Sequence, residues 1–289
     1  MSERAAGAVG VERSPAASVT SAAARRRPPR RRWTSRILPT YTAVVIFYLI
    51  SPILVMILYS FNQTSNNRVT FKWQGFTAYW WGHVFDIPDL TSALKVSLAL
   101  AAASTVMATV LGTLAGLALV RYRFRGKGTF DMVMFMNISA PEIVLGSSLL
   151  ALFVTLQFNR GFLTLLLAHV MFSIAYVAIT VRARLTGFDR SLEEAAQDLG
   201  ANPWVTFYKV TLPLIWPGVL AGALLAFALS IDDFITSSFV NGRTLTFPLW
   251  VYGATRTGVP PQVFVMGTLI FTFGIVLAVS NVAWQRKKS

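Results

Sequence analysis

The chain has 289 residues, of which 54% are hydrophobic and 13% are charged, and its net charge is +14. Because soluble domains carry about 25% charged residues, this composition excludes an ordinary soluble protein. The absence of cysteine excludes disulfides, thiolate metal sites and a cysteine nucleophile, and the basic residues lie between apolar runs rather than in one patch, which argues against nucleic-acid binding.

The N-terminal segment, residues 1–36, is basic and rich in Ala, Ser, Arg and Pro. A segment with so few large apolar residues cannot bury a core, so we predict a disordered basic tail. The apolar run that follows is too long for the core of a signal peptide and has no small-residue cleavage site after it, so it is expected to remain as a membrane span. Residues 37–285 are then expected to form one transmembrane domain.

Six apolar runs are long enough to cross a bilayer, because a hydrocarbon core of about 30 Å needs roughly 20 apolar residues in a helix. They are Ile37–Ser60, Val96–Val120, Met132–Phe158, Gly161–Val181, Gly218–Val240 and Val263–Trp284. The expected fold class is therefore an all-α membrane protein with about six transmembrane helices. Pro141, near the middle of the third run, predicts a kink there.

The distribution of Lys and Arg predicts the orientation, because these residues accumulate in cytoplasmic loops. If both termini are cytoplasmic, the inside segments hold 20 of the 26 basic residues and the outside segments hold five. We therefore predict a multi-pass protein of the cytoplasmic membrane with both ends in the cytoplasm.

Small residues recur every four positions in two of the runs. They are Ser104, Ala108, Gly112 and Gly116 in the second run, and Gly218, Gly222, Ala226 and Ser230 in the fifth. Small residues let apolar helices approach closely in lipid, although Gly and Ala are common in membrane helices in any case. We expect both stripes to be helix-packing faces.

The segment between the fourth and fifth runs, residues 182–217, is too polar to cross the membrane. Ser191 and Glu194 have the spacing of a capping box, with Ser191 as the N-cap of a short amphipathic helix. Gly200 follows at the position of a left-handed helix end. Pro203 is expected to begin a second short helix, which Leu212-Pro213 should end.

This segment resembles the EAA loop of ABC-importer permeases: Glu194-Ala-Ala, three residues, Gly200, nine residues, then Val210-Thr-Leu-Pro213. Val210 stands where Ile is more usual in that family, and a chance amphipathic loop helix is the alternative. The resemblance implies a type I importer fold in which this loop docks on a cytoplasmic ATPase. The coupling residues that it implies are Glu194, Ala195, Ala196, Gly200, Leu212 and Pro213.

Four shorter stretches resemble the polyamine (putrescine/spermidine) permease subgroup. They are SPILVMILYSFN (51–62), PEIVLG (141–146), LLAFALSIDDFITSSFVNG (224–242) and GVPPQ (258–262). The resemblance implies four kinds of partner: an ATPase dimer, a second permease subunit (identical or a heterologous sister), an extracytoplasmic substrate-binding protein and membrane lipid. The chain has no GxxxxGK[ST] phosphate loop, so we expect a transporter subunit that is not itself an enzyme and holds no cofactor, with ATP and Mg²⁺ bound by the ATPase.

Three acidic residues fall within the predicted spans, where charge is costly and commonly functional: Glu142, Asp232 and Asp233. In a continuous fifth helix Asp233 shares a face with Ser230, Thr236 and Ser237, so we expect Asp233 to face a wet pathway and Asp232 to lie against a neighbour. A cationic solute such as a polyamine accounts for these acids. The alternative is structural, with the acids paired to Lys95 or an Arg, or protonated by burial.

The two histidines are not expected to bind metal. His169, in the fourth run, is interpreted as a hydrogen-bonded core residue, and His83, beside two tryptophans, as an interfacial one.

The sequence is also compatible with other functions. The same kind of permease could carry ferric iron, sulfate or phosphonate, although no Arg or Lys cluster that would suit an anion is present near the spans. A proton-coupled secondary transporter would use the acids as a relay and would not need the EAA loop. A membrane enzyme lacks any arrangement of nucleophile and base.

Overall fold

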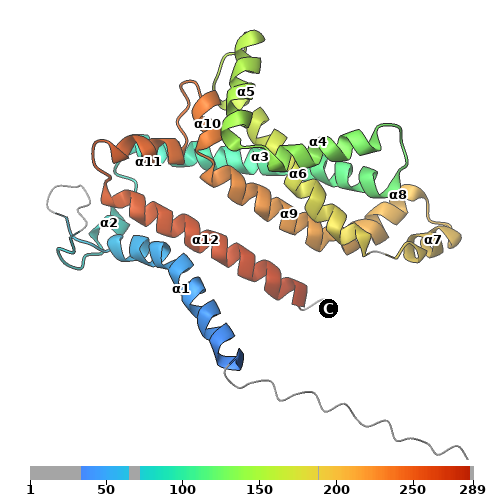
Figure 1. The fold of residues 1–289 in the computed structure, drawn as a ribbon, viewed down its shortest axis with the longest axis horizontal. Helices are drawn as coiled ribbons and strands as arrows, with labels where there is room; N and C mark the ends of the chain where they lie inside the picture. The colour runs from blue at the N-terminus through green and yellow to red at the C-terminus, as the bar shows by residue number, and fades with distance from the viewer. Residues whose placement is uncertain (1–33, 65–71, 188, 287–289) are drawn as a thin grey trace, which may run out of the picture. The chain divides into compact units, whose positions relative to one another are not determined.

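The computed structural model describes residues 34–64, 72–187 and 189–286 (Figure 1). Residues 1–33 of the predicted tail lie outside the described residues, and 34–36 already belong to the first helix. By its internal contacts the chain divides into two units, Met1–Ser51 and Pro52–Ser289. The described part of the first unit is helical, and its apolar side chains are exposed. An apolar, exposed helix suits a lipid environment.

The described residues are almost entirely helical. In chain order the elements are α1 (Thr34–Tyr59), α2 (Tyr79–Gly82), α3 (Pro88–Arg121), α4 (Lys127–Ser139), α5 (Glu142–Thr155), α6 (Phe162–Thr186), α7 (Ser191–Asp198), α8 (Pro203–Thr206), the π-helical segment η1 (Phe207–Thr211), α9 (Leu212–Asp232), α10 (Ile235–Val240), α11 (Phe247–Thr255) and α12 (Pro261–Arg286). Within these residues five helices are long and apolar enough to span a membrane, or six if the bent pair α4 and α5 is one span. The predicted fold class is confirmed.

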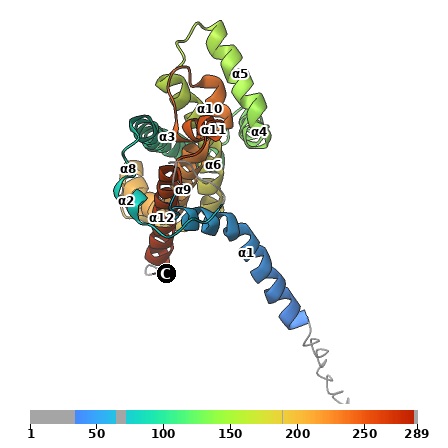
Figure 2. The same ribbon diagram turned by 90° about the vertical axis from the view of Figure 1, so that its left-hand side faces the viewer.

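The core of the second unit is formed by α3, α6 and α9, which pack against one another (Figure 1 and Figure 2). Both predicted small-residue stripes are buried. The glycines of both stripes face α6. A Cβ added to Gly112 of α3 would lie 2.7 Å from the Val177 Cβ of α6, and one added to Gly222 of α9 would lie 3.3 Å from the same residue's Cα. The prediction of two packing faces is confirmed, and α6 is the helix that both of them contact.

The third predicted span, Met132–Phe158, is not a single helix. The chain bends by 111° between α4 and α5. Ala140 and Pro141 are both extended at this point. For Ala140 the reason is the proline that follows it, because a proline disfavours helical backbone in the residue before it. The expected kink is therefore a complete break, and Glu142 lies at the start of α5 rather than in mid-helix.

The prediction that Leu212-Pro213 ends a short helix is wrong. The chain is continuously helical from Pro203 to Asp232, through α8, η1 and α9. A proline normally disrupts a helix because its ring crowds the carbonyl four residues earlier, which here is that of Lys209. Lys209 lies in the wider π-helical turn, and such turns relieve this kind of crowding.

The fifth predicted span, Gly218–Val240, is also interrupted. The helix α9 ends at Asp232, Asp233 is extended, and the short helix α10 starts at Ile235. The predicted face that joins Asp233 to Ser230, Thr236 and Ser237 as one helical stripe is therefore wrong, because it assumes an unbroken helix.

We predict that Gly112→Ala destabilises the protein by about 1–3 kcal/mol, the usual cost of overpacking a tight contact. The added methyl group would push apart α3 and α6, because its Cβ would lie only 2.7 Å from the Val177 Cβ and 2.9 Å from the Ile174 carbonyl oxygen. The measurement is the thermal unfolding midpoint of the detergent-solubilised protein. Gly274→Ala in α12 is the matched control, because no described atom outside its own helix backbone lies within 4 Å of the added Cβ. Equal midpoints for the two variants would contradict the packing interpretation.

Candidate functional site

The polar segment between α6 and α9 is shorter than predicted. Both ends of residues 182–217 are helical extensions of α6 and of the helix that begins at Pro203, so the connection is reduced to α7 and the short segments that flank it. The predicted capping box is wrong, because Ser191 is the first helical residue and not the N-cap. The N-cap is Arg190, and the carboxylate of Asp189 before it accepts the Ser191 N–H at 3.0 Å; this hydrogen bond lowers the pKa of Asp189.

The bend after α7 has the predicted geometry. Gly200 has a φ of +86°, in the left-handed region that favours glycine. The Asn202 side chain accepts the Val205 N–H at 2.9 Å, and Pro203 is the first residue of α8. Leu199 and Trp204, on either side of this bend, are exposed apolar residues.

The six residues that the EAA resemblance singles out fall into two groups. Glu194, Ala195, Ala196 and Gly200 lie together on α7 and its exposed end, whereas Leu212 and Pro213 belong to the continuous helix. Leu212 packs against the core between α6 and α9, and Pro213 is exposed. In the first group Glu194, Ala195 and Gly200 are exposed and Ala196 is half-buried.

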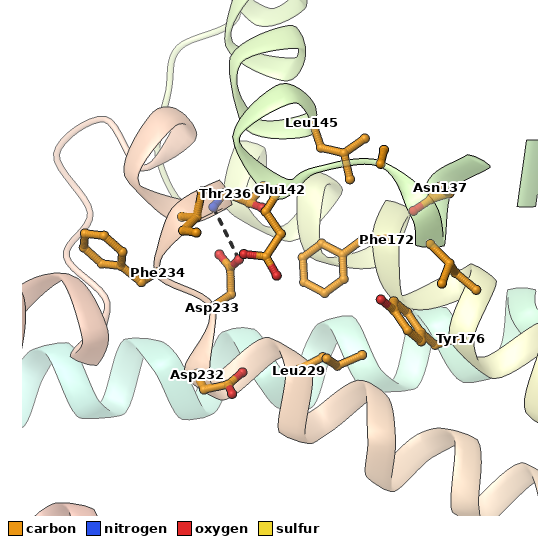
Figure 3. A pocket seen from close by; sticks show the side chains of 13 residues that line it. Asn137, Glu142, Leu145, Phe172, Tyr176, Leu229, Asp232, Asp233, Phe234 and Thr236 are labelled. Carbon is orange, nitrogen blue, oxygen red and sulfur yellow. Dashed lines mark hydrogen bonds between the residues drawn. The ribbon is translucent and has the colours of Figure 1, made fainter. Parts of the chain in front are cut away.

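A cavity of about 460 Å³ lies where α4 bends into α5 and where α9 ends. All three acids that the sequence singled out line it, together with Phe172 and Tyr176 of α6 (Figure 3). Figure 3 shows the Glu142 carboxyl group beside that of Asp233. The Asp232 side chain, at the end of α9, lies apart from these two groups. The structure thus brings together residues that are about 90 positions apart in the chain.

The two neighbouring aspartates have different environments, in the opposite order to the one predicted. The Asp233 carboxylate accepts the Ser237 N–H at 2.7 Å and the Thr236 N–H at 3.4 Å, so it caps α10. It also lies 3.5 Å from the His169 Nε2, and its side chain is 7% exposed. Asp232 is exposed. The expectation that Asp232 is the buried acid of the pair is therefore wrong, although both aspartates line the cavity.

His169 joins the helices of the core through a buried polar network. Its Nδ1 lies 2.7 Å from the Ser230 hydroxyl and its Nε2 lies 3.0 Å from the Ser237 hydroxyl. The Ser104 hydroxyl of α3 lies 3.0 Å from that of Ser230. The interpretation of His169 as a hydrogen-bonded core residue is confirmed. Its partners could not be identified from the sequence, because they lie 61 and 68 positions away.

The acids around the cavity have no basic partner other than His169 within the described residues. Lys95, the partner considered from the sequence, forms no ion pair with them there. In the same part of the chain, no group of three or more His, Asp or Glu side chains has the geometry to hold a metal ion. The cavity therefore presents carboxylates that a cation from outside the chain could contact.

A second cavity, of about 550 Å³, adjoins the first and is mostly apolar. Asp232 and Phe234 line both cavities. Phe234 also stacks at a tilt on Tyr252 of α11, with ring centroids 4.7 Å apart. Asp232 thus lies between an acidic space and an aromatic, apolar one.

Known proteins are similar to this chain over most of its length. Residues 108–288 match the family described as binding-protein-dependent transport system inner membrane component. The chain is 41% identical over 245 residues to the putrescine transport system permease protein PotI of Escherichia coli, covering 82% of this chain and 85% of the relative. It is 39% identical over 247 residues to the spermidine/putrescine transport system permease protein PotC of Haemophilus influenzae, covering 85% and 95%.

Solved structures show the same fold at low sequence identity. A chain of the bacterial alginate ABC transporter, solved with an alginate pentasaccharide-bound periplasmic protein, has a TM-score of 0.63 at 15% identity, covering 88% of this chain and 94% of that chain. A chain of the MetNI methionine ABC transporter in an inward-facing conformation has a TM-score of 0.56 at 18% identity, covering 69% and 96%.

Proposed function

Because this chain belongs to the family of binding-protein-dependent transport system inner membrane components, we propose that it is the permease subunit of an ATP-driven importer that carries a polyamine inward. The observation that carries the choice of solute is the group of three acids around one cavity, Glu142, Asp232 and Asp233, with no Lys or Arg partner in the described part of the chain. Relatives that cover most of both chains are putrescine and spermidine/putrescine permeases.

The chemistry of the two cavities suits a polyamine. Each ammonium group that leaves water needs a charged acceptor, and hydrogen bonds to a carboxylate are among the strongest available. The methylene chain between ammonium groups needs an apolar surface, which the space beside Phe234 and Tyr252 offers. An anion such as sulfate or phosphonate would be repelled by the same carboxylates, so these solutes are disfavoured.

The exposed residues of α7 and of the bend after it support the proposal that an ATPase is a partner of this chain. We propose that an ATPase dimer, which would bind ATP and Mg²⁺, docks on Glu194, Ala195, Ala196 and Gly200. The helix that starts at Pro203 continues for 30 residues to Asp232, a length of about 45 Å at the rise of an α-helix. Movement of the docking surface would thereby reach the cavity through one helix. A proton-coupled secondary transporter would have no use for this surface.

The remaining partners and the orientation complete the proposal. A second permease subunit, most simply a heterologous sister, would complete the pathway, and an extracytoplasmic binding protein would deliver the solute. We propose that both termini are cytoplasmic and that residues 1–36 are a cytoplasmic tail, in line with the distribution of Lys and Arg.

We predict that Asp232→Asn lowers putrescine uptake about ten- to hundredfold, the effect of losing one charge-assisted hydrogen bond to a bound ammonium group. The amount of assembled transporter should be unchanged, because Asp232 is exposed. Asp233→Asn should lower both uptake and the amount of folded protein, since Asp233 also caps α10. The measurement is radiolabelled putrescine uptake per assembled complex in reconstituted vesicles. Asp86→Asn, an exposed acid that does not line the cavity, is the control; unchanged uptake in Asp232→Asn would exclude a cation contact there.

We predict that Gly200→Val and Glu194→Lys reduce the amount of ATPase that copurifies with the permease. Valine is strained at a φ of +86°, and Lys reverses the charge on the docking surface. The control is Gly187→Val, in the same connection, because Gly187 has a φ of −91° and no described atom crowds its added Cβ. Native ATPase binding in both test variants would contradict the docking role.

The orientation is tested by cysteine labelling, since the native chain has no cysteine. A membrane-impermeant maleimide added to intact cells should label Arg243→Cys and should leave Gln197→Cys unlabelled until the cells are opened. Both side chains are exposed. The adjacent Gly242 is unsuitable, because its φ is +58° and an added Cβ would lie 2.3 Å from the Arg160 carbonyl oxygen. The reverse labelling pattern would invert the topology.

A further inference from the structure

The short helix α7 has little packing of its own. Every residue of α7 is described, and none of them is buried. It packs against α8 and η1, which follow it in the chain. A helix of two turns is marginally stable in water without tertiary contacts. Its position relative to the membrane helices must therefore depend on a few specific interactions.

One such interaction joins three elements at the carboxylate of Glu193. The same Glu193 oxygen, Oε1, accepts hydrogen bonds from the Arg121 guanidinium and from the Thr211 hydroxyl. Arg121 is the last residue of α3, and Thr211 is the last residue of η1, immediately before α9. The Arg121 Nη2 also lies 3.4 Å from the Thr211 Oγ1. Glu193, Arg121 and Thr211 thus form a closed junction between α7, α3 and the start of α9.

The junction is more shielded than an ordinary surface ion pair. The side chains of Arg121 and Glu193 are 23% and 13% exposed, and Thr211 is fully buried. Exposed ion pairs contribute little because water and salt screen them, whereas a partly buried, hydrogen-bonded pair is costly to break from one side. The ion pair of Arg182 with Asp131 is more exposed, at 42% and 31%, and joins α6 to α4 without involving α7.

We propose that Arg121 and Glu193 are positioning residues that fix α7 to α3 and to the start of α9, so that a displacement of α7 moves both membrane helices together. This inference rests on the proposed docking of an ATPase on α7. Without the junction, α7 would remain connected to the membrane core only through the chain on either side of it and its contacts with α8 and η1. A push on α7 would then be absorbed by bending of that turn rather than transmitted to α3.

The functional test uses the complete transporter in vesicles. Arg121→Gln and Glu193→Gln should retain the bound ATPase, while putrescine transported per ATP hydrolysed falls about tenfold, as expected for the loss of one charge-assisted hydrogen bond. Combining Arg121→Glu with Glu193→Arg should restore most of this ratio. Asp131→Asn, which removes the comparable pair away from α7, should leave the ratio at the native value.

Any of the following results would overturn the proposal: a native ratio in both single variants, an equal fall in Asp131→Asn, or an exchanged pair as uncoupled as the single variants. A loss of bound ATPase in parallel with transport would also overturn it, because the residues would then act in docking.

A second measurement does not depend on the solute. Spin labels on Tyr122→Cys and Gln197→Cys, at the end of α3 and on α7, report how rigidly the two elements are joined, and both positions are exposed. One narrow distance distribution is expected with and without nucleotide, and Arg121→Gln should broaden it. An unchanged width would overturn the proposal. If the native complex failed to move polyamines, the proposed function would fall, whereas this distance measurement would still test the junction.

Discussion

The close approach of α6 to both α3 and α9 is the constraint on which the rest of the structure depends. Lipid is as apolar as the side chains it meets, so burial of apolar surface gives little reason for membrane helices to associate. Close packing of the helix backbones holds the helices together instead, and only residues as small as Gly112 and Gly222 permit that close contact with Val177. The His169 network lies in the same interface and adds hydrogen bonds that require one alignment of the three helices.

The irregular backbone of this protein is concentrated where the proposed function needs it. Broken helices are tolerated at membrane depth only if the freed backbone groups find partners or line a wet space. At the end of α9 the Asp233 carboxylate supplies such a partner to α10, and the cavity supplies the space. Near the other end of the helix, the π-helical segment relieves the crowding that the Pro213 ring would cause.

The features that depend on local sequence could be predicted, and those that depend on distant contacts could not. Apolar runs indicate spans, and Gly200 indicates a left-handed helix end, because both follow from residues within one turn or one bilayer thickness. Helix continuity through Pro213 and the interruption at Asp233 depend on η1 and on partners in α6 and α10. The order of the two aspartates was inverted for that reason, since a periodicity argument presumes an unbroken helix. The resemblance to EAA loops identified the exposed surface of α7 but gave no indication of Arg121, which lies 72 positions from its partner.

The break between α9 and α10 also determines the electrostatic field in the cavity. A helix carries about half a positive charge at its N-terminus and half a negative charge at its C-terminus. Glu142 lies in the first turn of α5, and Asp233 caps the N-terminus of α10, so each of these carboxylates is partly neutralised by a helix dipole. Asp232 lies at the opposite pole, the C-terminus of α9, where the dipole adds to its charge. A cation that enters the cavity therefore meets three carboxylates of unequal strength, and the strongest attraction comes from the one that borders the apolar space.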